Sequence, residues 1–319
     1  MTVLNRRETL SAAIGTAGAA LARPVAAAVR PTKNDISLAA WSLNLSFFRH
    51  HRWKNTDLPK ICRQDLGISG IEFVNQFFDN PTLRNLAELK RQLSDHNIHP
   101  VLIMIDAEGD MSAADAAERR RASIAHRKWV DVADYLGCHA VRCNMGGPRS
   151  DWAQDRDLTR RAAESFHDLL DYSFASGINV VIENHGGASS DPDVLVRLMR
   201  AVDHPRFGTL PDFGNVNQGD NHAEVIRKLV PYAKGISVKA HWTMDGKHPG
   251  YSIEELIKIC QEAGYSGYWG IESGFDPGSR GSNGRPEYSG LSAEDIWQNE
   301  VKAVMLTKQV LERTVLQSS

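Results

Sequence analysis

Three acids and one histidine each follow a stretch of apolar, strand-like sequence. They are Glu183, Asp212, His241 and Glu272, separated by 29, 29 and 31 residues. These intervals are about the length of one strand-helix unit in a chain that repeats such units. Three carboxylates and an imidazole directed at one point repel one another unless a divalent cation lies among them. The spacing therefore predicts a metal site, although each residue taken alone could be an ordinary polar residue at a strand end.

The segments that deliver these residues are typical of strands buried on both faces, with short continuous apolar runs. They span residues 178–183, 207–212, 235–241 and 267–272. Four further strand candidates precede them, at residues 36–41, 68–74, 100–106 and 139–144.

Amphipathic helical patterns separate the strand candidates. They cover residues 82–96, 112–136, 157–175, 192–202, 222–229, 252–263 and 293–311. Pro192 suits a first helical position, and Ser252 with Glu255 has capping-box spacing. No G-x-G-x-x-G motif follows the first strand, so the alternation predicts a single (β/α)8 TIM barrel over residues 31–319 rather than an open doubly wound sheet. In such a barrel the strand ends meet at one face, which would bring the four polar residues into one cup.

The first thirty residues are expected to lie outside the barrel. Arg6 and Arg7 precede an apolar, small-residue run over 10–21, and alanines at 26–28 suit cleavage by signal peptidase. We interpret residues 1–30 as a twin-arginine signal for export to the periplasm. The alternative is an N-terminus that contains an arginine pair by chance. The apolar run is too short for a permanent span, so we expect no stable membrane span in the mature form.

Composition agrees with an ordinary globular domain. Apolar residues make up 42% of the chain, charged residues 24%, and the formal net charge is −2. Cleavage after Ala28 would leave a charge of about −4, which predicts no bulk attraction to nucleic acid. The four cysteines form no C-x-x-C motif. We expect buried thiols, with a disulfide left open.

Several longer motifs resemble a known family. They lie at residues 71–78, 102–110, 126–131, 136–142, 182–187 (IENHGG) and 208–215 (GTLPDFGN). Together they resemble the sugar phosphate isomerase/epimerase proteins of the xylose isomerase-like barrel superfamily, over essentially the whole chain from about Ile36. The resemblance implies a xylose isomerase-like TIM barrel that acts on a small-molecule sugar.

The resemblance also implies roles for individual residues. In metal-dependent members, strands five to eight supply Glu, Asp, His and Glu to one divalent cation, and Glu183, Asp212, His241 and Glu272 match in type and order. Such a ligand set suits Mn2+, Mg2+ or Co2+, with Zn2+ as an alternative. In the ketose epimerase branch the first and last glutamates also transfer protons, which makes Glu183 and Glu272 the catalytic candidates. The implied activity is a metal-dependent sugar isomerase or epimerase that forms an enediolate.

Other residues are candidates for substrate binding. Arg142 and Asn144 end the fourth strand, where they could bind sugar hydroxyls or a carboxylate, or form an inward salt bridge instead. His185 lies two residues after Glu183 and could contact substrate or orient its neighbours. Lys239 could enter the cup or pair with Glu183 or Asp212.

Trp41 could form an apolar wall for a sugar ring or belong to the core. Glu72, on the second strand, is a further candidate for substrate binding or for orienting its neighbours. We expect Asp106 or Glu108, after the third strand, to orient neighbouring groups.

Three other functions fit parts of the sequence. A metal-dependent lyase or hydratase acting on keto-glycosides would share the enolising first step, and export favours it because sugar phosphates are scarce outside the cytoplasm. An exported sugar-binding protein would not need the glutamate pair. A nuclease of the apurinic endonuclease type is disfavoured because Asn215 stands where a histidine would be needed. The loops after strands seven and eight differ from those of close relatives, so no particular sugar is assigned, and homo-oligomer formation stays open.

Overall fold

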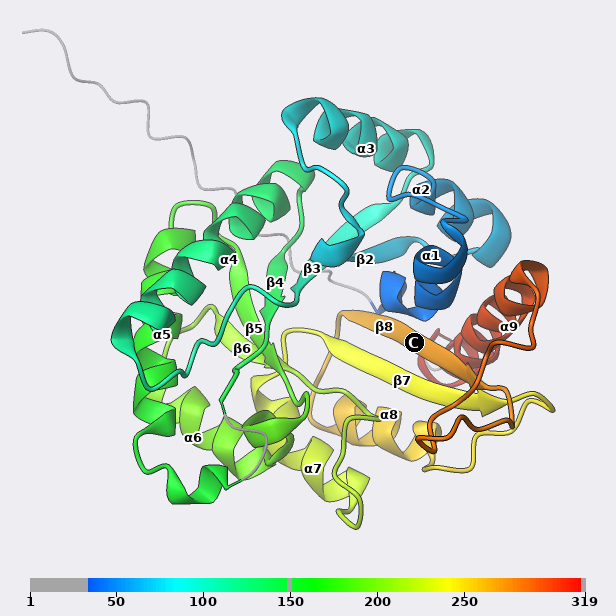
Figure 1. Ribbon diagram of the computed structural model, residues 1–319. Helices are drawn as coiled ribbons and strands as arrows, with labels where there is room; N and C mark the ends of the chain where they lie inside the picture. The colour runs from blue at the N-terminus through cyan, green and yellow to red at the C-terminus, as the bar shows by residue number, and fades with distance from the viewer. Residues whose placement is uncertain (1–33, 148–150, 317–319) are drawn as a thin grey trace, which may run out of the picture.

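Parallel strands need long return connections, and the helical segments between the strands supply them. The protein is described by a computed structural model over residues 34–147 and 151–316 (Figure 1). Its strands are β1 Asp35–Ala39, β2 Gly70–Val74, β3 His99–Ile105, β4 Ala140–Cys143, β5 Asn179–Glu183, β6 Phe207–Leu210, β7 Ile236–Thr243 and β8 Tyr268–Asp276. They form one sheet in the order β6-β5-β4-β3-β2-β1-β8-β7, with every neighbouring pair parallel.

The ring closes between β6 and β7 through the segment that follows β6. The Ser237 amide donates to the Pro211 carbonyl at 2.9 Å, and the Phe213 amide donates to the Ser237 carbonyl at 3.1 Å. Asp212 lies between these two bonds and bridges to Ser237. The predicted TIM barrel is therefore confirmed, and Asp212 stands where the barrel closes.

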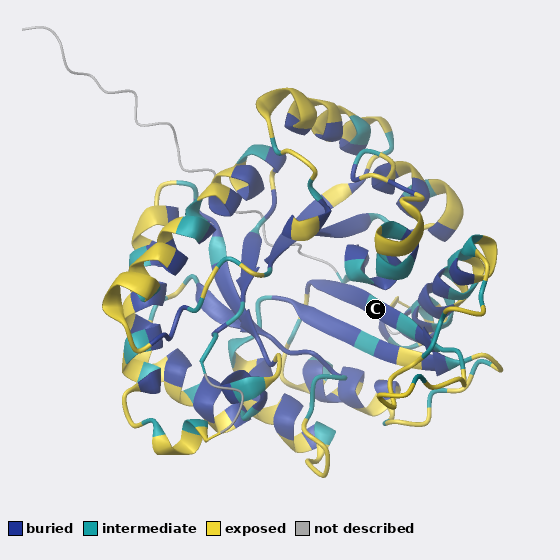
Figure 2. Ribbon diagram, viewed as in Figure 1, coloured by how far each residue is buried: buried dark blue, intermediate teal, exposed yellow. Residues whose placement is uncertain are grey.

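Helices surround the barrel and bury one face each against it (Figure 2). After the short α1 Asn44–His50 and α2 Leu58–Lys60 come α3 Leu83–Asp95, α4 Ala116–Leu136, α5 Leu158–Ser173, α6 Pro192–Val202, α7 His222–Leu229, α8 Ile253–Glu262 and α9 Ala293–Leu311. The expected caps are present for two of them, because Asp191 accepts from the Asp193 amide and Ser252 from the Glu255 amide. These caps satisfy amides that have no partner within their own helix.

Some element boundaries differ from the sequence prediction. Strand β1 ends at Ala39, so Trp41 lies in a 3-10 turn, η1 (Ala40–Leu43), rather than on the strand. Strands β7 and β8 run on to Thr243 and Asp276 because they pair with each other beyond the barrel rim. Part of the segment predicted as a loop after the eighth strand is therefore strand.

The four cysteines are free and buried, as expected. The predicted export signal at residues 1–30 lies outside the described residues. Within residues 34–147 and 151–316, no helix is both long and apolar enough to cross a bilayer.

Candidate active site

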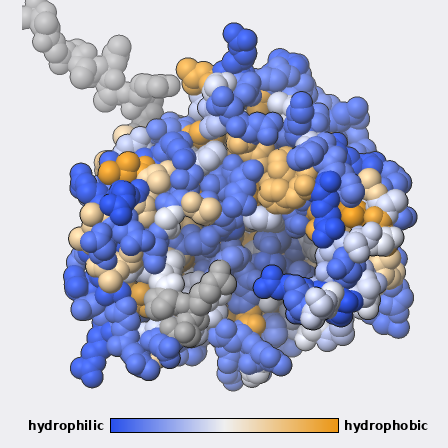
Figure 3. Space-filling view, viewed as in Figure 1, coloured by the Kyte–Doolittle hydropathy of each residue, from blue (hydrophilic) through white to orange (hydrophobic). Residues whose placement is uncertain are grey.

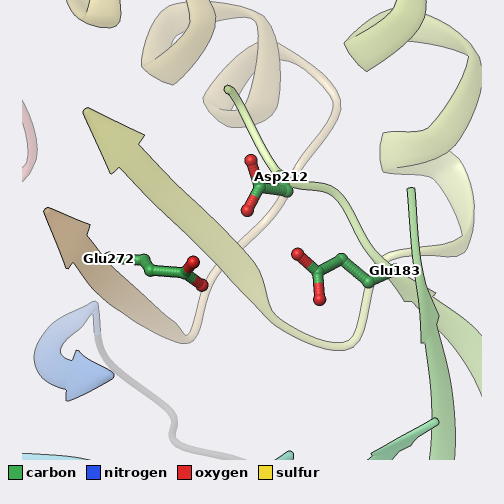
Figure 4. Close-up of side chains that lie close together, drawn as sticks. All are labelled: Glu183, Asp212 and Glu272. Carbon is green, nitrogen blue, oxygen red and sulfur yellow. The ribbon is translucent and has the colours of Figure 1, made fainter. Parts of the chain in front are cut away.

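Three of the four predicted metal ligands converge at the carboxyl ends of the strands. Glu183 is the last residue of β5, Asp212 follows β6, and Glu272 lies on β8. One carboxylate oxygen from each lies within 4.8 Å of the others, and the three groups face a common space (Figure 4). Glu183 and Asp212 are fully buried, and the Glu272 side chain is 12% exposed. We call these three residues the carboxylate cluster.

A buried arginine supports one side of the cluster. Arg142 on β4 places Nε 2.9 Å from Glu183 Oε2 and Nη1 2.6 Å from Asp106 Oδ1, with its side chain only 2% exposed. Asn144 donates to the same Asp106 oxygen at 2.7 Å. Of the two interpretations of Arg142, the inward salt bridge is the contact that the structure contains. A role for Arg142 or Asn144 in substrate binding stays a prediction.

A lysine ammonium lies on the other side of the cluster. Lys239 Nζ is 2.6 Å from Glu272 Oε1, 3.2 Å from Asp212 Oδ2 and 3.2 Å from Asn215 Oδ1. Of the alternatives for Lys239, the pairing with Asp212 is a contact that the structure contains, and the ammonium also pairs with Glu272. Each of the three N–H groups of the ammonium therefore has one acceptor within reach.

The residues around Asp212 fix its carboxylate in place. Oδ1 accepts from the backbone amides of Gly214 at 2.7 Å and Asn215 at 2.8 Å, and Oδ2 accepts from Ser237 Oγ at 2.9 Å. The Asn215 side chain also donates to Glu183 at 2.8 Å. Sequence reasoning did not assign Ser237 or Asn215 to the site. Strand alternation could have found Ser237, which lies two residues before the lysine and so on the same face.

The two predicted histidines lie apart from the cluster. His241 is exposed on the part of β7 that extends beyond the rim, and none of its atoms belongs to the group of close ligand atoms found among the described residues. Its role as a fourth ligand stays a prediction. His185 is also exposed, and its backbone amide donates to Ser189 Oγ. Its contact with substrate likewise stays a prediction.

The last two substrate candidates lie deeper or to one side. Trp41 is half-buried and its ring packs 5.3 Å from Phe77 and 6.1 Å from the half-exposed Phe48. Glu72 on β2 is buried, accepts from Ser37 Oγ at 2.6 Å, and has no hydrogen bond to its other oxygen. Burial raises the pKa of Glu72 to about 7. Contact of either residue with substrate stays a prediction.

Burial and neighbouring charges shift the pKa values of Glu183 and Asp212 in opposite directions. The pKa of Glu183 is raised well above its usual value, because burial removes water and Asp212 and Glu272 add like charge, which outweighs Arg142. Burial would also raise the pKa of Asp212, but the Lys239 charge and the donated hydrogen bonds outweigh it and lower that pKa. One carboxyl group that holds a proton beside another that stays ionised is an arrangement suited to acid-base chemistry.

The carboxylate cluster could hold a metal ion as far as its oxygens are concerned. Three hard oxygens at this separation can each approach one ion to about 2.0–2.6 Å. Lys239 Nζ is not a ligand, however, and it already lies within hydrogen-bond distance of two of the three carboxylates. The described arrangement, with an ammonium beside the carboxylates and His241 outside the cluster, does not favour the four-ligand set, which stays a prediction.

A pocket opens beside the cluster. It has a volume of about 250 Å³ and reaches from Lys239 and Gly214 past Tyr251 and His248 to Asp276. The pocket thus has Lys239 at one end and the segments after β7 and at the end of β8 at the other. The molecular face in Figure 3 is mainly hydrophilic and is hollowed near its centre, with an apolar patch beside the hollow.

The fold and this arrangement agree with the family assignment. The model of the family described as "Xylose isomerase-like TIM barrel" matches residues 63–303. The chain belongs to this family. A comparison with curated proteins finds no significant match in sequence.

Solved structures with the same fold include several sugar epimerases. The L-ribulose 3-epimerase structure is 15% identical, with a TM-score of 0.69 over 89% of this chain and 97% of that one. A 3-keto-D-glucoside 4-epimerase from E. coli is 15% identical, with a TM-score of 0.62 over 86% and 99%. A xylose isomerase-like TIM barrel protein from Mycobacterium smegmatis in complex with magnesium is 16% identical, with a TM-score of 0.59 over 88% and 98%. At these identities the likeness establishes the fold.

Proposed function

We propose that this protein is a sugar isomerase or epimerase that moves a proton at the carbon beside a carbonyl group. Glu183 and Glu272 are the proton-transfer pair. The observation that supports this most directly is their convergence from β5 and β8 on one space next to a pocket of small-molecule size. The sugar epimerases among the structures of the same fold support the same class of substrate.

The reaction is a balanced proton exchange. One carboxylate removes the proton from the carbon next to the carbonyl, and the electron pair of the broken C–H bond moves to form an enediolate. Return of a proton to the other face of the same carbon gives the epimer, and return to the neighbouring carbon gives the isomer. The raised pKa of Glu183 suits the group that delivers the proton.

The enediolate carries a negative charge and needs a positive charge beside it. The cation that the sequence implies is one divalent ion, Mn2+, Mg2+ or Co2+ with Zn2+ as an alternative, held by Glu183, Asp212 and Glu272 with His241 as a fourth ligand. Such an ion would act as a Lewis acid on the sugar oxygens. Lys239 is the other cation within reach of this position.

Solvent-deuterium uptake tests the proposal without knowledge of the product. The protein would be incubated in D2O with D-tagatose, D-allulose, L-ribulose and a 3-keto-D-glucoside, each with and without Mn2+, and followed by NMR. We expect deuterium on the carbon beside the carbonyl of at least one sugar. The Glu272→Gln variant should cut this exchange at least about a hundredfold, the scale of a lost acid-base group.

Glu262→Gln on α8 is the matched control, since Glu262 is exposed and is not among the residues that line the pocket. It should exchange at the wild-type rate. A Glu272→Gln protein that folds and exchanges as fast as this control would eliminate the assigned role. Release of an unsaturated sugar without an epimer would instead identify the lyase reaction.

A further inference from the structure

Lys239 has the position and the contacts of a resident cation. Its Nζ lies between Glu272 on β8 and Asp212 after β6, and Asn215 supplies the third acceptor. These distances of 2.6 to 3.2 Å are those of ammonium hydrogen bonds. Two N–H groups of the ammonium face carboxylates of the cluster and the third faces Asn215, so convergent oxygens hold the lysine as they would hold a metal ion.

The backbone around the lysine is built to admit its side chain. A Cβ atom at Gly214 would lie 3.0 Å from both Cγ and Cδ of Lys239, closer than such contacts normally are. Tyr251 donates its hydroxyl hydrogen bond to the Lys239 carbonyl and so fixes the strand at this residue. Lys239 is also the register partner of Glu272 in the pairing of β7 and β8, which places the ammonium and that carboxylate side by side.

Repulsion from the ammonium opposes a divalent ion in the cluster. Two buried or nearly buried cations face the cluster: Arg142, which Glu183 shares with Asp106, and Lys239, which pairs with Asp212 and Glu272. A divalent ion would add two positive charges and place them against the ammonium in a site with little water, where such repulsion is weakly screened.

We propose that the Lys239 ammonium takes the place of a divalent metal ion in this protein, so that enolisation of the sugar proceeds without a metal. This inference rests on the proposed function for its chemistry. When substrate is bound, one N–H of the ammonium turns from Asn215 to the oxygen on which the enediolate charge develops, while Glu183 and Glu272 exchange the proton. Asp212 and Glu272 hold the ammonium in position through its other two N–H groups.

Metal binding tests the inference independently of any substrate. Purified wild-type protein, treated with EDTA and dialysed, would be titrated with MnCl2 and followed by calorimetry and by thermal unfolding. We expect weak binding and no rise in melting temperature for the wild type. Lys239→Met removes the competing charge but keeps the chain length, so it should bind Mn2+ at least about tenfold more tightly and unfold at a higher temperature when Mn2+ is present.

Two further variants separate charge from packing. Lys228→Met removes an exposed lysine paired with Asp193 and should bind Mn2+ as the wild type does. Gly214→Ala keeps every charged group but crowds the lysine stem, so it should slow deuterium exchange and strengthen Mn2+ binding in the same direction as Lys239→Met, to a smaller extent.

The wild-type measurements decide the question even if a variant does not fold. Stoichiometric divalent metal that survives purification, or Mn2+ binding by the wild type as tight as that of Lys239→Met, would overturn the inference. Exchange that stops in EDTA and returns with Mn2+ would also overturn it, while leaving the proposed function intact. Exchange that continues in EDTA supports it. If no sugar exchanges with or without metal, the proposed function fails, and the Mn2+ titration still decides the role of Lys239.

Discussion

Replacing Arg142 by methionine should destabilise the protein strongly, because it leaves two carboxylates without their common partner. The guanidinium lies 2.9 Å from Glu183 Oε2 and 2.6 Å from Asp106 Oδ1, with Glu183 1% and Asp106 14% exposed. Removal of one partner from a buried ion pair usually costs about 3–5 kcal/mol. We expect the free energy of unfolding of Arg142→Met, measured in urea at pH 7, to fall by about this amount.

The loss should depend on pH with a definite sign. In the wild type burial alone would raise the pKa of Asp106, but the Arg142 charge and the hydrogen bonds from Arg142 and Asn144 together lower it. Without that charge, the folded-state pKa of Asp106 would rise above the unfolded-state value, and the pKa of Glu183, already raised in the wild type, would rise further. A carboxyl group of that kind destabilises the fold when it ionises, so the deficit of the variant should shrink as the pH falls from 7 to 5.

Two variants complete this experiment. Arg127→Met on α4 breaks a pair with Asp168 that is partly exposed on both sides, and it should cost no more than about 1 kcal/mol. The double variant Arg142→Met with Glu183→Gln removes one stranded charge and should recover part of the loss. A deficit below about 1 kcal/mol for Arg142→Met, or the same deficit at pH 5 and pH 7, would refute the reasoning.

Two other predictions concern stability and export. Burial raises the pKa of Glu72 from 4.5 to about 7, so its ionisation destabilises the wild type as the pH rises through that range. Glu72→Gln keeps the acceptor for Ser37, and its free energy of unfolding should exceed that of the wild type by an amount that grows from pH 5 to pH 8, up to about 3 kcal/mol. Urea unfolding at several pH values in which this difference does not grow with pH would contradict the prediction. A fusion of residues 1–30 to a folded reporter should be exported, and Arg6→Lys with Arg7→Lys should block it; undiminished export of the double variant in a fractionation assay would show that the N-terminus was misinterpreted.

The sequence was sufficient for the barrel and for the part of the site formed by strand ends. Strand periodicity and spacing brought Glu183, Asp212 and Glu272 to one place, because residues that end successive parallel strands share one face of a barrel. Arg142 and Lys239 were recognised as residues of the cup with a pairing role among the alternatives. Their partners follow from the cross-strand register, which a single sequence does not specify.

The interpretation of His241 depended on where β7 ends. The spacing of 29 residues placed it at a strand end, but β7 continues to Thr243 by pairing with an equally extended β8. Side chains at 237, 239 and 241 therefore point to the same side at three successive heights along the strand. The lowest two, Ser237 and Lys239, reach Asp212, whereas His241 lies at the rim. Residue type and spacing cannot distinguish these heights without the register.

The carboxylate cluster and the closure of the barrel depend on the same contacts. Asp212 holds β6 to β7 through its bridge to Ser237, and the Ser237 hydroxyl binds its carboxylate. Each cation of the site also comes from a strand next to its anion: Arg142 from β4 beside β5, and Lys239 from β7 beside β8. A substitution that frees a carboxylate for catalysis or for metal binding therefore also removes a link between neighbouring strands. For this reason metal affinity, exchange rate and unfolding free energy must be measured on the same variants, since a change in one alone identifies the chemical role and a change in all three identifies the structural one.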